Sequence, residues 1–178
     1  MTALRFIARV AAFCTAAVVA CTAAAQGDEA TARAMLAKYA GSYDTDAFLK
    51  EPAVRAELQK LLGAQMNHLE HNLNVKGSVD LIGQTLSLSG NAPHQGTKEE
   101  AVVCVVPFNM TVEAAILSKG GVTVFTRAEK YEYTTLCIKD WITLANSGHV
   151  DRVEQPANVR VVKPRCPTAS HVDPLHLQ

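Results

Sequence analysis

The sequence predicts an α+β domain in which helices precede a roughly five-stranded antiparallel β-meander, and a short helix follows it. Between residues 30 and 72 apolar positions recur at helical spacing, whereas from residue 79 onward they alternate with polar neighbours. The segments with strand spacing are mostly joined by tight turns, which connect antiparallel strands. With 48% hydrophobic and 19% charged residues among 178, the composition is that of a globular protein, and we expect one domain.

Helical segments are expected first. Residues 30–39 carry apolar side chains at helical spacing, and Asp44 can cap the start of a second helix. A longer pattern begins at Pro52, which suits the first turn of a helix, and ends at Gly63. Residues 65–72 continue as a further helix with an apolar stripe.

The expected strands cover residues 79–81, 86–88, 101–106, 111–117 and 122–126. The first two turn near Gly83. The third is a continuous apolar and β-branched run that ends at Pro107, which is typical of a central strand covered on both faces. The last two form a hairpin, because Gly120 and Gly121 suit its turn.

The end of the chain is expected to contribute little to the sheet. Residues 138–144 around Trp141 predict a final short helix. The four prolines after residue 150 predict a tail. The domain is therefore expected to span residues 26–150, with residues 151–178 as a proline-containing C-terminal tail.

Residues 1–25 have the order of a secretory signal peptide, because two arginines precede an apolar run and a group of small residues. The run is too short to span a bilayer. Cleavage after Ala25 would release a periplasmic protein with 15 Lys and Arg against 17 Asp and Glu. Residues 18–21 also resemble a lipobox, so a lipoprotein anchored through Cys21 is the alternative. Nothing later in the sequence resembles a transmembrane span.

Several function classes are excluded by missing features. A net charge of zero argues against a nucleic-acid partner. The sequence lacks a nucleophile elbow, an H-E-x-x-H motif, a P-loop and a dinucleotide fingerprint, so we expect no enzyme and no cofactor. A hydrolase is the alternative, with Glu99 or Glu100 near His94. His68 and His71 would share a helix face, but no third ligand accompanies them, and we expect no metal site.

The exported chain retains Cys104, Cys137 and Cys166, in a compartment where disulfides persist. Cys104 lies in an apolar run and Cys137 precedes Ile138, so we first expect both to be small buried hydrophobes. A single bridge, either Cys137–Cys166 or Cys104–Cys137, is the alternative. Exposed strand edges and an unpaired thiol also leave a homodimer as an alternative to a monomer.

The connection between the second and third expected strands is longer than the hairpin turns, and its centre reads Asn91, Ala92, Pro93, His94, Gln95 and Gly96. Because proline fixes its own φ, this loop would project His94 from the end of the sheet on a stiff base. Turn residues commonly serve the backbone alone, and a surface loop with one solvated histidine is the simpler interpretation.

The stretch 79–96, with the apolar strand after it, resembles the Ivy family of periplasmic inhibitors of vertebrate (C-type) lysozyme. The loop of that family reads C-K-P-H-D-C. Positions 91–96 of this chain keep the Pro-His pair and the loop length, but lack both cysteines, the lysine and the aspartate. The order of the helix-rich segment, the strands and the late tryptophan extends the resemblance from Phe48 to Leu144.

The resemblance implies a partner and a mechanism. In Ivy-type inhibitors the loop enters the lysozyme cleft and its histidine contacts the two catalytic carboxylates, which assigns that role to His94. Because this chain lacks the disulfide of the family's loop, its loop would have to be ordered on binding, at a cost in conformational entropy. Side-chain hydrogen bonds from Asn91 or Gln95 would restore some stiffness. The alternative is an Ivy-like envelope interaction or immunity-type protein with another target, such as a different wall-degrading enzyme.

Overall fold

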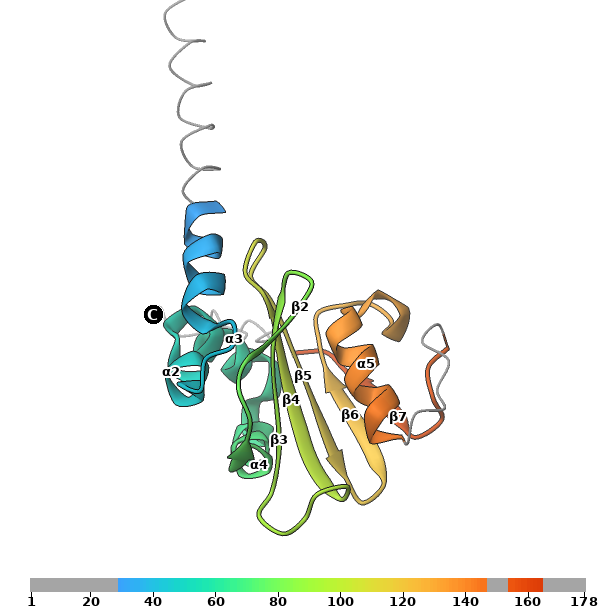
Figure 1. The fold of residues 1–178 in the computed structure, drawn as a ribbon. Helices are drawn as coiled ribbons and strands as arrows, with labels where there is room; N and C mark the ends of the chain where they lie inside the picture. Colours follow the sequence, from blue (N-terminus) through green and yellow to red (C-terminus); the bar gives the residue numbers. More distant parts are fainter. Residues whose placement is uncertain (1–28, 147–153, 165–178) are drawn as a thin grey trace, which may run out of the picture.

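The computed structural model describes residues 29–146 and 154–164, which form three layers (Figure 1). A seven-stranded, mostly antiparallel sheet lies between a group of helices on one face and helix α5 (Leu136–Ala145) on the other. This is the predicted α+β class, with more strands than the roughly five expected. The signal segment 1–25, with Cys21, lies outside the described residues.

The helices on the first face follow the predicted order: residues 29–39, α2 (Thr45–Lys50), α3 (Pro52–Leu62), the 3-10 helix η1 (Gly63–Gln65) and α4 (Met66–Asn72). Asp44 caps α2, because its carboxylate accepts a hydrogen bond from the backbone N–H of Ala47 at 3.3 Å. Pro52 opens α3, and Gly63 follows it with a left-handed φ of 52°. In the part of the chain that the structure describes, no helix is long and apolar enough to cross a membrane.

The strands are β1 (Val75–Lys76), β2 (Asp80–Ile82), β3 (Thr85–Asn91), β4 (Glu99–Val106), β5 (Thr111–Ser118), β6 (Gly121–Phe125) and β7 (Val159–Val162). Their order in the sheet is β1-β3-β4-β5-β6-β7, and β2 also pairs with β3. Every described pairing is antiparallel except that of β6 with β7. The predicted meander therefore corresponds to β2–β6.

Strand β7 corrects the prediction for the C-terminal segment. It pairs in parallel with β6, with Val122 opposite Val159 and Phe125 opposite Val162. A parallel pair needs a long crossover connection, and α5 lies within that connection. The prediction of a tail over residues 151–178 is wrong at this strand. Four residues with little alternation of polar and apolar side chains do not indicate a strand by themselves, and only the pairing with β6 identifies one.

The sheet separates two apolar cores. Val103 and Val105 of β4 face the first helical group, whereas Val102 and Cys104 face α5. Successive side chains of β4 therefore enter opposite cores, which confirms the prediction of a central strand covered on both faces. This double coverage makes β4 a rigid base for the connection that precedes it.

Cys104 of β4 and Cys137 of α5 form a disulfide, with their Cα atoms 6.1 Å apart. Each cysteine is 1% exposed. The expected burial of both cysteines and the alternative bridge between Cys104 and Cys137 are confirmed. The interpretation of both as unpaired and the alternative bridge between Cys137 and Cys166 are wrong, because the strand turns Cys104 toward the face that α5 covers. The thiol-based argument for a homodimer now depends on Cys166, which lies outside the described residues.

A buried carboxylate fixes the start of α5. Glu113 of β5 is 1% exposed and accepts two hydrogen bonds, from the Thr126 hydroxyl at 2.6 Å and from the Thr135 backbone N–H at 2.8 Å. Thr135 is also the residue that caps α5. A carboxylate at a helix start is favourable because it satisfies a free N–H and complements the helix dipole.

Candidate functional site

The connection between β3 and β4 projects from one end of the sheet (Figure 1). Its first residue, Ala92, is fully buried, whereas residues 93–98 are exposed. The loop is thus rooted in the core at one residue and presents the following six to solvent. His94 lies among the exposed residues, as the sequence predicts.

Backbone hydrogen bonds order this loop. The N–H of Gln95 donates to the carbonyl of Ala92 at 3.0 Å, and the carbonyl of Gln95 accepts from the N–H groups of Lys98 at 3.1 Å and Glu99 at 2.9 Å. The N–H of Ala92 donates to the carbonyl of Glu99 at 2.9 Å and closes the base. A loop ordered before it meets a partner loses less conformational entropy on binding.

Two non-glycine residues of the loop have left-handed backbone conformations, His94 with a φ of 60° and Thr97 with a φ of 68°. Such conformations are uncommon outside glycine and persist where surrounding hydrogen bonds impose them. The His94 ring forms no hydrogen bond with any described residue. Within the described part of the chain, both ring nitrogens are thus without a hydrogen-bond partner, and each can act as a donor or an acceptor.

Asn91 and Gly96, which stand where the Ivy loop has its cysteines, lie side by side. The Asn91 side-chain amide donates to the carbonyl of Ala92 at 2.8 Å, which confirms the predicted bond from Asn91 to the loop backbone. A Cβ placed on Gly96 would lie 4.0 Å from the Cγ and Nδ2 of Asn91. Positions 91 and 96 therefore lie close together, and the Asn91 side chain stiffens the start of the loop through a local hydrogen bond.

The double variant Asn91→Cys/Gly96→Cys is expected to form a disulfide and to raise the free energy of unfolding by about 2 kcal/mol, because a short loop is closed in the unfolded chain. Gly96 has no positive φ, so a cysteine there meets no backbone penalty. Peptide mapping by mass spectrometry detects the cross-link, and thermal unfolding measures its effect. The single variants serve as controls. A double variant that stays reduced under oxidising conditions would contradict the proximity.

Glu99, the first residue of β4, is held from two neighbouring elements. Its carboxylate lies 3.0 Å from the Nε2 of His68 and 3.3 Å from the donating amide of Asn72, both on α4, and it accepts from the Ser118 hydroxyl at 2.7 Å. Burial acts to raise the pKa of the Glu99 carboxyl, but the hydrogen bonds from His68, Ser118 and Asn72 outweigh it and hold that pKa below its ordinary value. The loop base is thereby tied to α4 and β5.

The arrangement does not supply the acid–base pair of the hydrolase alternative. The Glu99 carboxylate is engaged with α4 and β5, and Glu100 accepts a hydrogen bond from the backbone N–H of Thr97 at 2.6 Å. Within the described residues, neither carboxylate is hydrogen-bonded to His94. His68, considered above as a metal ligand, instead contacts Glu99.

Metal-binding groups are not clustered in residues 29–146 and 154–164, where no three His, Cys, Asp or Glu side chains could hold an ion together. The absence of a cofactor stays a prediction.

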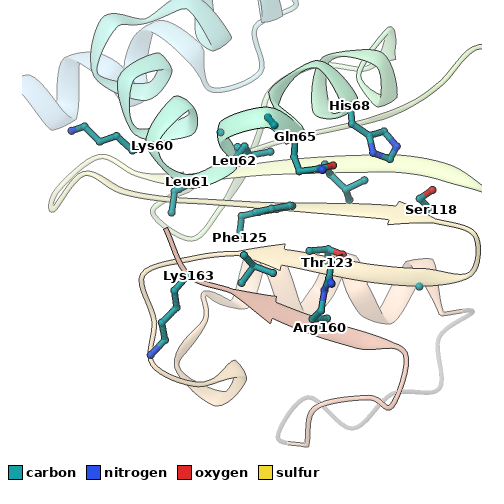
Figure 2. Close-up of a pocket in the computed structure, with 15 residues that line it drawn as sticks. Lys60, Leu61, Leu62, Gln65, His68, Ser118, Thr123, Phe125, Arg160 and Lys163 are labelled. Carbon is teal, nitrogen blue, oxygen red and sulfur yellow. Dashed lines mark hydrogen bonds between the residues drawn. The ribbon is translucent and has the colours of Figure 1, made fainter. Parts of the chain in front are cut away.

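A concave surface lies on the helical side of the sheet. It is a groove of about 810 Å³ between the end of α3 and strands β6 and β7, with Gln65 on one wall and Thr123 and Arg160 on the other (Figure 2).

The sequence profile of the family described as inhibitor of vertebrate lysozyme (Ivy) matches residues 53–146. No curated protein and no solved structure matches the chain. The matched range covers more than half of the 178 residues and includes α3 from its second residue, α4, strands β1 to β6, the loop that carries His94 and α5. The chain therefore belongs to the Ivy family of inhibitors of vertebrate lysozyme.

Proposed function

We propose that this protein inhibits C-type lysozyme by inserting the loop between β3 and β4, through its exposed residues 93–98, into the active-site cleft of the enzyme. Family membership supports the class of target. The observation that carries the mechanism is the placement of His94, which is exposed in a loop ordered by its own backbone hydrogen bonds. Its ring has no described hydrogen-bond partner.

The chemistry of the target suits an imidazole. Lysozyme works with one carboxylic acid and one carboxylate, which flank the sugar bond. The two nitrogens of His94 can donate to a carboxylate on one side and interact with the second carboxyl group on the other. A loop in that position also fills the space that the substrate sugar needs, so inhibition follows from contact and from exclusion together.

The test is a titration of the purified protein into a C-type lysozyme lysis assay. Wild type is expected to inhibit at micromolar concentration or below, and His94→Ala is expected to raise the required concentration at least about tenfold, as for a central interface residue. His71→Ala removes an exposed histidine on α4 and should behave as wild type. An inactive wild type, or a fully active His94→Ala variant, would remove the proposed mechanism.

The residues beside His94 favour a second candidate target. Ala92 and Gln95 stand where the Ivy loop has lysine and aspartate, so the two flanking charges are absent and a different cleft would be matched. An endogenous wall-degrading enzyme is the candidate. Capture of a muramidase or transglycosylase by wild type but not by His94→Ala, together with no effect on C-type lysozyme, would establish this target instead.

A periplasmic location would suit the proposed function. We propose that residues 1–25 direct export and are removed after Ala25. The alternative is cleavage before Cys21 and acylation of that cysteine. The mass of the mature protein distinguishes the two, because the first begins at Gln26 and the second carries a lipid on Cys21.

A further inference from the structure

One end of the groove on the helical side of the sheet adjoins the base of the His94 loop, because His68 and Ser118 line the groove and both contact Glu99. The helices of the first face contact β3, β4 and β5, and the sheet continues beyond them to β6 and β7. Figure 2 shows Leu61 and Leu62 of α3 on one wall, opposite Phe125 of β6 and Arg160 of β7. A volume of about 810 Å³ is within the range of ligand-binding sites in proteins.

The ionisable side chains that line this groove are all basic, and one of them, His68, contacts Glu99, which is not part of the lining. The lining contains two lysines, an arginine and a histidine, and no aspartate or glutamate. Lys60 is paired with Glu57, which also binds Arg127. Arg160 only approaches the Thr123 hydroxyl, at 3.4 Å, and Lys163 makes no ion pair with a described residue. Arg160 on β7 and Lys163 just after it therefore have no acidic partner among the described residues.

The remaining lining is a mixture of apolar and polar groups. Leu61, Leu62 and Phe125 supply apolar surface, and Gln65 and Thr123 interrupt it with hydrogen-bonding groups (Figure 2). An acyl chain needs a continuous apolar wall, and the polar groups of this groove interrupt its apolar surface. A peptide alternates apolar side chains with backbone polar groups and suits this mixture better.

We propose that the groove binds a short peptide segment that carries carboxylates and alternating apolar side chains. Arg160 would pair with one carboxylate through its forked guanidinium group, and Lys163 with a second. An apolar side chain between them would lie near Leu61 and Phe125. Because both cations are exposed and ion pairs at exposed sites are weak, we expect a dissociation constant on the order of 100 µM.

The proposal is tested by titrating the full chain with three acetylated pentapeptides, Glu-Val-Glu-Val-Glu and its counterparts with Gln or Lys in place of Glu, followed by amide NMR. The acidic peptide is expected to bind at least about tenfold more tightly than the neutral one. The largest shifts are expected at Ala64 and Thr123 rather than in residues 92–98. Affinity should fall as salt is added.

Variants locate the site. Arg160→Gln/Lys163→Gln is expected to lower the affinity for the acidic peptide to that for the neutral one. Arg33→Gln/Lys130→Gln removes two exposed cations outside the groove and should leave it unchanged. Equal binding of the acidic and neutral peptides, no binding at millimolar concentration, or binding of dodecanoate in place of the peptides would each overturn the proposal.

Discussion

Replacement of Cys104 and Cys137 together by alanine is expected to lower the free energy of unfolding by about 3–4 kcal/mol. The disulfide joins residues 33 positions apart, so it removes many conformations from the unfolded chain. Both sulfur atoms lie in the core between β4 and α5, and their loss also removes buried contacts. Denaturant unfolding followed by Trp141 fluorescence measures the change, because this tryptophan lies on α5 and is 8% exposed.

The control for this prediction is wild type treated with a reductant, which should lose most of the same stability without a change of sequence. Inhibition of lysozyme below the unfolding temperature is expected to persist in the double variant, because the His94 loop is anchored through α4 and β5 rather than α5. Unfolding free energies within 1 kcal/mol of each other for variant and oxidised wild type would contradict the role given to the bridge.

Glu99→Ala is expected to lower the free energy of unfolding by about 2 kcal/mol and to weaken inhibition at least about tenfold. The substitution removes the acceptor for His68, Ser118 and Asn72. Asn72 is fully buried and would keep only backbone acceptors, the carbonyls of Glu100 and Leu117. The start of β4 would then be held to α4 only through the Asn72 bond to the Glu100 carbonyl, so the loop that it closes would open more often.

Glu99→Gln is the matched variant, because it keeps the shape and an acceptor oxygen but removes the charge. It should lose less stability than Glu99→Ala. Amide hydrogen exchange of Ala92, Lys98 and Glu99 in the free protein reports loop opening without any partner. Unchanged exchange in Glu99→Ala would contradict the anchoring role, whatever the outcome of the lysozyme assay.

The pH dependence of this anchor has a definite sign. The folded-state pKa of Glu99 lies below its ordinary value of 4.5, so the ionised carboxylate stabilises the fold above that value. The contribution is lost as the pH falls through the depressed folded pKa. Wild type is therefore expected to lose stability on acidification below about pH 4.5 more steeply than Glu99→Gln. Parallel pH profiles for the two proteins would contradict this assignment.

Part of the structure of the loop between β3 and β4 could be predicted from the sequence. The Pro93-His94 pair is read directly from the sequence. The strands on either side give the loop length, and the turn residues between them indicate that His94 is exposed. The bond from Asn91 to the next carbonyl is equally local. The left-handed φ of His94 was not predicted, because it depends on hydrogen bonds that close only when Gln95 meets Glu99.

By itself, the sequence determined the helices and the antiparallel strands β2 to β6, because periodicity over a few residues reports which side chains must be buried, whereas the two-residue strand β1 is too short to show a period. It also located the loop. Only the tertiary structure decided which cysteines pair, that residues 159–162 join the sheet, and that Glu99 meets partners 19 to 31 positions away. A local pattern shows that a face is covered, whereas the identity of the covering element depends on contacts between distant parts of the chain.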